Sequence, residues 1–249
     1  MSVPPPDQRR PGLPRAEFDL LADEYEQQHR SNVAISGEEP AFFAEYKVAD
    51  LADFVRKGRL ASGRILDFGC GIGNSVPFFR KHFPDSRLCG ADVSPRSIEI
   101  ARSRFPGSET YLQIDDSLEA EDDSFDIVFS ACVFHHIPHA DHRRWLVELL
   151  RVTRPTGLLA IYEHNPLNPL TVRAVNTCPL DVNAELITAA TMRRRAADAG
   201  WGAARRDYRL FFPSALRALR DLEPHLGWLP LGAQYRLIGR KCGPADEPR

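Results

Sequence analysis

Hydrophobic residues follow two patterns along this chain: a helical spacing and short, nearly continuous apolar runs. Residues 16–32 space Phe18, Leu21 and Tyr25 along one face of a helix. Residues 40–58 repeat the helical spacing and begin with a proline, which favours the first turn of a helix. The chain therefore opens with two predicted amphipathic helices.

After these helices, short apolar runs alternate with helical patterns. Strands are predicted at residues 64–68, 87–91, 110–114, 125–131, 158–162, 204–211 and 234–240. Helices are predicted at residues 75–83, 97–104, 141–152 and 183–199. Alternation of this kind is typical of βαβ units, and almost continuously apolar strands fit a sheet covered on both faces. We therefore expect an α/β fold: a doubly wound, mostly parallel, seven-stranded sheet with helices on both faces.

The same pattern divides the chain into four parts. Residues 1–15 are proline-rich and predicted to be a flexible tail, and residues 16–58 an N-terminal helical lid. Residues 59–242 form the core domain, in which residues 214–232 supply a helix and loop over the sheet, and residues 243–249 are a second tail. A length of 249 residues with 43% hydrophobic and 27% charged residues suits such a globular chain.

Charge and cysteine content limit the kinds of binding partner and the cellular compartment that we expect. The formal net charge of −2 gives no electrostatic reason to expect nucleic acid. Five cysteines without a CxxC pair suit a reducing cytoplasm, and no apolar run approaches the length of a membrane span. We expect a cytoplasmic protein with a small-molecule substrate and with neither nucleic acid nor membrane as partner. The pattern leaves the oligomeric state open.

The strongest chemical signal is a glycine turn between a predicted strand and a helix. Residues 64–74 read RILDFGCGIGN, so Gly69, Gly71 and Gly73 follow the strand directly. Glycines let the backbone turn tightly and let a ligand approach closely. Asp67 lies two residues before the first glycine, and Asp92 ends the next predicted strand.

These carboxylates indicate which ligand the turn holds. A dinucleotide fingerprint requires a third glycine at position 74, where this chain has Asn74. The charge of Asp67 would also repel a pyrophosphate. A ligand with an ammonium or sulfonium group and a ribose diol, which Asp92 would bind, fits better. No tyrosine is followed four residues later by lysine, as a short-chain dehydrogenase would need.

Four segments in this order resemble the class I S-adenosylmethionine (SAM) dependent methyltransferases. They are ILDFGCGIGN, LCGADVS, DDSFDIVFSACVFHHI and LLRVTRPTGLLAIYE. The resemblance is strong over residues 60–165 and implies a Rossmann-like fold, SAM as cofactor and S-adenosylhomocysteine as product. It implies cofactor-binding roles for Asp67, Gly69, Cys70, Gly71 and Gly73 around the methionine portion, Asp92 at the ribose, Val93 and either Asp115 or Asp116 at the adenine, Ser130 and Ala131 near the sulfonium, and Tyr25 in the N-terminal helix.

Histidines and one glutamate supply the candidate catalytic groups. His135 and His136 follow the fourth strand, while Glu163 and His164 follow the fifth, at the sheet edge where ligands bind in open α/β folds. His139 and His142 continue the HHxxHxxH spacing on the predicted first turn of a helix, facing solvent. Methyltransferases of the catechol type place Asp and Asp-Asn after these strands to bind a metal, and this chain does not, so no metal is expected.

The predicted function is transfer of a methyl group from SAM to an oxygen or nitrogen atom of a small molecule, a biosynthetic intermediate such as a sugar or a secondary metabolite. The terminus of a peptide or protein is the alternative acceptor. An NAD(P)-binding Rossmann oxidoreductase and a binding module that has lost turnover are the two rival functions on this fold.

Overall fold

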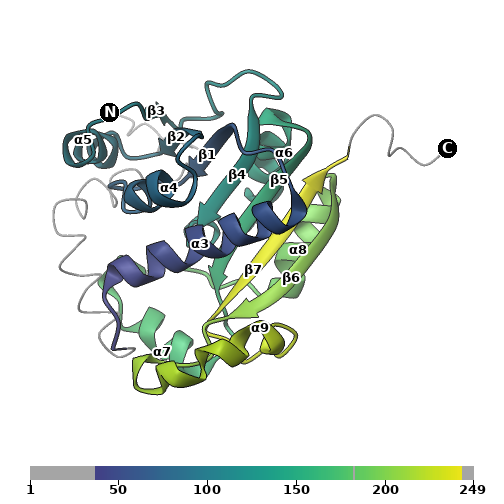
Figure 1. Ribbon diagram of the computed structural model, residues 1–249. Coiled ribbons are helices and arrows are strands. Elements are labelled where there is room, and N and C mark those ends of the chain that lie inside the picture. The colour runs from purple at the N-terminus through teal and green to yellow at the C-terminus, as the bar shows by residue number, and fades with distance from the viewer. Residues whose placement is uncertain (1–36, 182, 243–249) are drawn as a thin grey trace, which may run out of the picture.

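The computed structural model describes residues 37–181 and 183–242 of the chain. These residues form one sheet of seven strands (Figure 1). The strands are β1 (Arg64–Phe68), β2 (Arg87–Asp92), β3 (Thr110–Gln113), β4 (Phe125–Ala131), β5 (Thr153–His164), β6 (Trp201–Arg209) and β7 (Gln234–Lys241). The helices are α3 (Pro40–Gly58), α4 (Val76–His82), α5 (Pro95–Arg104), α6 (His142–Val152), α7 (Pro169–Asn176), α8 (Ala189–Asp198) and α9 (Glu223–Leu226), with the 3-10 helices η2 (Phe134–His136), η3 (Pro179–Asp181) and η4 (Ser214–Leu222).

The strand order is β3-β2-β1-β4-β5-β7-β6. Neighbours from β3 to β5 run parallel, whereas β7 is antiparallel to both β5 and β6. The strand order reverses between β1 and β4: β2 and β3 follow on one side, and β4 and β5 on the other. Doubly wound folds form a crevice at such a point, at the carboxyl ends of the strands. The predicted doubly wound, mostly parallel sheet of seven strands is confirmed.

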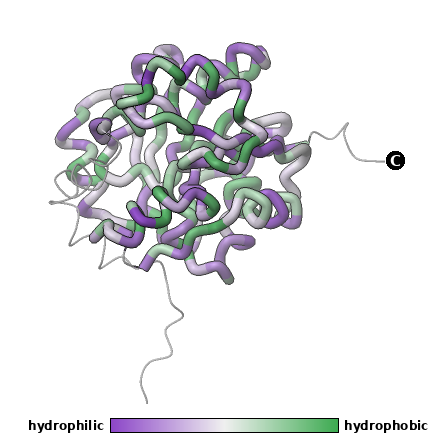
Figure 2. Tube along the Cα trace, turned by 90° about the horizontal axis from the view of Figure 1, so that it is seen from below, coloured by the Kyte–Doolittle hydropathy of each residue, from purple (hydrophilic) through white to green (hydrophobic). Residues whose placement is uncertain are grey.

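Helices cover both faces of this sheet, because its strands carry apolar side chains on both sides. On one face α3 and α4 pack against the strands through residues such as Leu51 and Phe79. On the other face α6 and α8 contribute Leu146 and Met192. Figure 1 shows α3 crossing in front of the strands, with α6 and α8 behind them. In Figure 2 the outer helices alternate hydrophilic and hydrophobic residues, as expected when only one helix face meets the sheet.

Two predicted elements begin five or more residues away from their predicted starts, and one α-helix of the structure was not predicted. The strand predicted at 158–162 extends over Thr153–His164, so β5 begins directly after α6. The helix predicted at 183–199 begins only at Ala189, because the Thr188 hydroxyl caps it by accepting from the Thr191 N–H. The stretch after β5, for which no helix is predicted, contains α7, and Asn168 caps this helix by accepting from the N–H groups of Leu170 and Thr171.

The predicted lid is only partly described. Its first helix, at residues 16–32 with Phe18 and Tyr25, lies outside the described residues. Its second, α3, packs on the sheet: Val48 and Leu51 are fully buried. Asp50 accepts a hydrogen bond from the Tyr162 hydroxyl of β5 at 2.8 Å. The α3 helix is therefore part of the core, and its N-terminal turns reach the cavity at the sheet edge.

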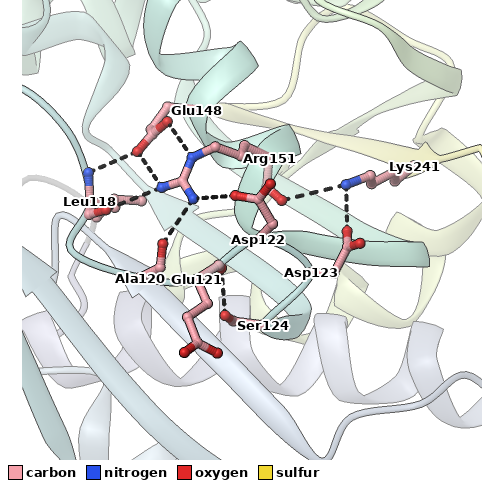
Figure 3. A network of polar contacts seen from close by, with 9 residues as sticks. All are labelled: Leu118, Ala120, Glu121, Asp122, Asp123, Ser124, Glu148, Arg151 and Lys241. Atoms are coloured by element: carbon pink, nitrogen blue, oxygen red, sulfur yellow. Dashed lines mark hydrogen bonds and ion pairs between the residues drawn. The ribbon is translucent and has the colours of Figure 1, made fainter.

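A network of polar contacts fixes the loop between β3 and β4 (Figure 3). Arg151 of α6 donates to Glu148, to Asp122 at 2.6 Å and to two loop carbonyls. Lys241 of β7 donates to Asp123 at 2.7 Å and to the Arg151 carbonyl. This loop leads into the amino end of β4, so the network stabilises the end of the sheet opposite the carboxyl ends of the parallel strands. Within the described part of the chain, no helix is long and apolar enough to cross a bilayer.

Candidate active site

A cavity of about 420 Å³ lies at the carboxyl ends of β1, β2, β3, β4 and β5. This volume is in the usual range for small-molecule sites. Its wall combines the turns after these five strands with the first turns of α3, with α7, and with the segment between β6 and η4. The polar and glycine-turn side of the wall includes Lys47, Asp67, Gly69, Cys70, Gly71, Asp92, Val93, Ile114, Ala131, Cys132, His135, His136, His164 and Asp181.

The glycine turn after β1 forms the floor of the cavity. Gly69 has φ +77°, and a Cβ there would lie 2.3 Å from the Val133 side chain, so only glycine fits. Gly73 has φ +81° and packs instead against α5, where a Cβ would meet Ala101 and Phe105 at 3.1 Å. Gly73 is absent from the cavity wall, so its role is to bring the turn against α5.

Asp92 connects β2 to this turn. Its Oδ2 accepts from the Gly71 N–H at 2.8 Å, and its Oδ1 accepts from the Ser94 N–H at 2.9 Å. The carboxylate is 8% exposed and lies on the cavity wall. It is therefore held by two backbone donors, in a fixed orientation, at the carboxyl end of its strand.

Asp67 is the more deeply buried of the two acids, at 3% exposure. Its Oδ2 has no hydrogen-bond partner among the described residues. Burial, together with the charge of Asp92, raises the pKa of Asp67 to about 7, against the opposing effect of Lys47. A buried acceptor of this kind is costly unless a donor reaches it. An ammonium group of a ligand would satisfy it, so the residues present fit the amino-acid end of SAM.

The other sequence-predicted cofactor residues divide between the cavity wall and other places. Val93 and Ala131 line the cavity, as does Cys70. Ser130 is fully buried beneath the wall rather than in it. Asp115 and Asp116 are both exposed and away from the wall, where the chain after β3 presents Ile114 instead. Asp116 accepts from Arg144 at 3.3 Å, and Tyr25 lies outside the described residues.

Glu163 organises the histidine side of the cavity. Its Oε1 accepts from the Val133 N–H at 2.9 Å and from the Phe134 N–H at 2.7 Å. Its Oε2 lies 2.6 Å from Nδ1 of His135. Burial alone would lower the pKa of His135, but Glu163 and Asp181 outweigh it and raise the pKa to about 10. His135 is therefore charged at neutral pH and is fixed by a carboxylate that is itself held by backbone.

Asp181, which no pattern in the sequence selects, joins this group from η3. Its Oδ1 lies 3.4 Å from Nε2 of His135 and 3.4 Å from Nε2 of His136. Burial would raise the pKa of Asp181, but its contacts with His135 lower it to about 2. The η3 segment is fixed here because the Glu185 N–H donates to the His135 carbonyl at 2.8 Å. A lone aspartate far along the chain carries no spacing signal, so only the fold shows it.

His136 and His164 complete the cavity wall on this side. Burial and the neighbouring charge of His135 lower the pKa of His136 to about 3, so its imidazole is neutral at pH 7. The His164 ring lies 5.2 Å from that of His135. Burial would raise the pKa of Cys132, but Lys47 and His164 outweigh it and lower the pKa to about 7.

The expectation that His142 faces solvent is wrong. Its side chain is fully buried, its Nε2 contacts the Ile137 carbonyl at 2.9 Å, and its Nδ1 contacts Arg195 of α8 at 2.6 Å. The helix turns this position toward α8 rather than outward. His139, three residues earlier, is 39% exposed at its side chain. His142 therefore serves packing of α6 on α8, away from the cavity.

Comparisons with known proteins agree with this geometry. Residues 65–157 match the family model described as a methyltransferase domain. Trans-aconitate 2-methyltransferase of Methylobacterium nodulans is 32% identical over 120 residues, which are 48% of this chain and 45% of that protein. Phthiotriol/phenolphthiotriol dimycocerosates methyltransferase of Mycobacterium leprae is 32% identical over 111 residues, 44% of this chain and 40% of that protein. The chain thus matches less than half the length of these curated relatives.

Solved structures share the fold over more of the chain. A SAM-dependent methyltransferase of Thermotoga maritima, described as a possible histamine N-methyltransferase, has a TM-score of 0.63 at 20% identity and covers 91% of this chain and 99% of its own. A phosphoethanolamine N-methyltransferase of Haemonchus contortus in complex with SAM has the same TM-score at 18% identity, covering 91% and 60%. Residues 65–157 therefore match a methyltransferase domain, and the described residues share the fold of SAM-dependent methyltransferases.

Proposed function

We propose that this protein transfers the methyl group of SAM to an oxygen or nitrogen atom of a small molecule bound in the cavity. One observation carries the proposal: two buried carboxylates beside a glycine turn, Asp67 and Asp92, open into the same cavity as a neutral histidine, His136. The two carboxylates suit a ligand in which a cationic amino acid is joined to a ribose. The histidine suits an acceptor that must lose a proton.

The cofactor half of the cavity would act by binding and orientation. Asp67 would receive the ammonium group of SAM, which satisfies its unpartnered Oδ2. Asp92, at the end of β2, would receive the ribose hydroxyls, and Val93 would contact the adenine. Because Asp115 and Asp116 are outside the wall, the adenine would rest on Ile114 and Val93 rather than against an acid.

The histidine half would handle the acceptor's proton. Methyl transfer is an in-line displacement in which the acceptor's lone pair forms the new bond to carbon and the C–S bond breaks, leaving S-adenosylhomocysteine. Alignment of the reacting atoms supplies roughly 7–11 kcal/mol and a general base about 10²–10⁴-fold. His136 is neutral at pH 7, whereas His135 already carries a proton. Because its pKa is about 3, His136 would take the proton only as the new bond to carbon makes the acceptor strongly acidic. His164 would contact the acceptor from the end of β5.

The acceptor would be a small molecule with apolar surface. Phe42 and Phe43 of α3 and Phe211 and Phe212 after β6 line the cavity, so much of its outer part is aromatic. The matched relatives are named for methylating trans-aconitate and phthiotriol dimycocerosates. Their acceptors are small molecules or lipids, which supports an acceptor of this kind over a peptide terminus. We infer a biosynthetic intermediate.

Calorimetry tests the cofactor half directly. SAM and S-adenosylhomocysteine should each bind the wild-type chain, and Asp92→Asn should lose most of the affinity. Asp198→Asn is the matched control, because Asp198 is exposed on α8. Heat with a nicotinamide dinucleotide but none with SAM would refute the proposal.

A mass-gain screen tests the transfer step. The protein is incubated with SAM and pooled metabolites, and products are searched for one added methyl group. His136→Ala should slow formation of that product by about 10²–10⁴-fold, whereas His139→Ala, which removes an imidazole outside the cavity, should not. Equal rates in the two variants would remove His136 from the mechanism.

A further inference from the structure

The His135, His136 and Asp181 side chains form a compact group of donors, here called the donor triad. One ligand atom from each lies within 4.8 Å of the others. The triad comes from η2 and η3, which are distant in sequence but joined by the hydrogen bond from the Glu185 N–H to the His135 carbonyl. His135 is almost fully buried, and the other two are partly buried.

The spacing within the triad suits a shared cation better than direct hydrogen bonds. Oδ1 of Asp181 is 3.4 Å from Nε2 of His135 and equally far from Nε2 of His136. A hydrogen bond between nitrogen and oxygen is normally about 2.7–3.2 Å long. Ligand atoms around a tetrahedral zinc ion, each at about 2.0–2.1 Å, lie roughly 3.3–3.4 Å apart. The two measured edges therefore match a tetrahedron of this size.

Glu163 prepares His135 for such a role. It holds Nδ1 at 2.6 Å, so Nε2 is the ring nitrogen left to face Asp181. Metal-binding histidines almost always give their second nitrogen to a carboxylate or carbonyl in this manner. The carboxylate is anchored in turn by the backbone N–H groups of Val133 and Phe134.

We propose that the donor triad binds a divalent transition-metal ion of the zinc class, with Glu163 orienting His135 from behind. Two imidazoles and one carboxylate are a donor set that suits such ions and leaves a coordination position open. All three residues line the cavity, so that position faces the space proposed for the acceptor. An oxygen or nitrogen atom of the acceptor would occupy it.

This inference changes two expectations drawn from the sequence. We expected no metal because the chain lacks the acids of the catechol-type methyltransferases after its fourth and fifth strands, but folding brings Asp181 to the histidines instead. An ion would displace the proton that His135 holds in the metal-free protein, because an imidazole binds a metal only in its neutral form. It would also take the ring nitrogen of His136, so with an ion bound His164 would be the residue that receives the acceptor's proton. Only the suggestion that the ion binds the acceptor rests on the proposed function. Ion binding itself does not, and its test needs neither SAM nor an acceptor.

The test titrates Co²⁺, followed by its visible absorption, and Zn²⁺, followed by calorimetry, into the full chain after removal of adventitious metal by a chelator. We expect one ion per chain. Glu163→Gln should weaken binding about 10–100-fold, as loss of an orienting partner does. Asp181→Asn and His136→Ala should weaken it further, because each removes a ligand. His139→Ala is the matched control, since its imidazole lies outside the triad, and should bind as the wild type does.

Each outcome either supports or overturns the metal site. No saturable binding by the wild type overturns the proposal, and so does equal binding by the wild type, His136→Ala and Asp181→Asn, because the ion would then lie elsewhere. Thermal melting checks that the variants fold. SAM calorimetry on the same samples separates the two proposals: cobalt binding without SAM binding refutes the proposed function alone, and the reverse result refutes the metal site alone.

Discussion

Asp67 should reduce the stability of the ligand-free protein as pH rises. Its pKa is raised from 3.8 to about 7 by burial and by Asp92. The folded state therefore holds the proton more tightly than the unfolded state between these values. A difference of about 3 units corresponds to roughly 4 kcal/mol. Relative to a variant without this carboxyl, the wild type is most stable below pH 4 and loses stability as pH rises to 7.

Urea unfolding of the wild type and Asp67→Asn, at pH 5 and pH 8 without ligand, measures this effect. The free energy of unfolding of the wild type minus that of the variant should be lower at pH 8 by about 2–3 kcal/mol. An exposed acid replaced in the same way, Asp198→Asn, should show no such shift. Addition of SAM at 100 times its Kd should stabilise the wild type by about 2.7 kcal/mol and leave Asp67→Asn almost unchanged.

A wild-type minus variant difference that is the same at both pH values would refute this reasoning. It would show that Asp67 ionises in the folded protein as readily as in the unfolded chain, through a donor that the described residues do not supply. Its role as receptor of the cofactor's ammonium group would then lose its physical basis. The result does not depend on any knowledge of the acceptor.

Three further predictions concern other parts of the molecule. Gly73→Ala, at φ +81° and with its Cβ against α5, should lower stability by about 1–3 kcal/mol, seen as a lower melting temperature. Arg236→Met leaves Asp50 and Asp207 without their buried partner and should cost about 3 kcal/mol in urea unfolding; a stability equal to wild type would contradict this. In the metal-free protein, ring NMR should show His135 charged up to about pH 10, and Glu163→Gln should lower the pKa of His135.

The fold was largely predictable because its strands are buried on both faces. Runs such as residues 158–162 are continuously apolar, and helical patterns between the runs left few topologies possible. The predicted bounds of helices were wrong where a capping side chain sets the first residue of the helix. Asn168 starts α7 inside a proline-rich stretch, and Thr188 delays α8, and neither residue changes the hydrophobic pattern.

The candidate site was predictable where its residues lie at or just after the ends of predicted strands, as Asp92, His136 and His164 do. Asp67 and Asp92 sit at strand ends, and parallel strands bring such ends together. Lys47 and Asp181 reach the same cavity from a helix before the sheet and a 3-10 turn after it. Their positions depend on how the chain passes across the sheet edge, which no spacing encodes. The adenine-binding role predicted for Asp115 or Asp116 stays a prediction, although both side chains are exposed and Ile114 lines the cavity instead.

The place of β7 has a consequence for how this protein is made. β7 is the last strand of the described chain to be synthesised, yet it lies between β5 and β6 and pairs with both. While the ribosome is still translating residues before Gln234, β6 has no partner and the wall near His164 is incomplete. The acceptor half of the cavity would therefore be complete only after this strand emerges, and a nascent chain stalled earlier would expose two unpaired strand edges to aggregation.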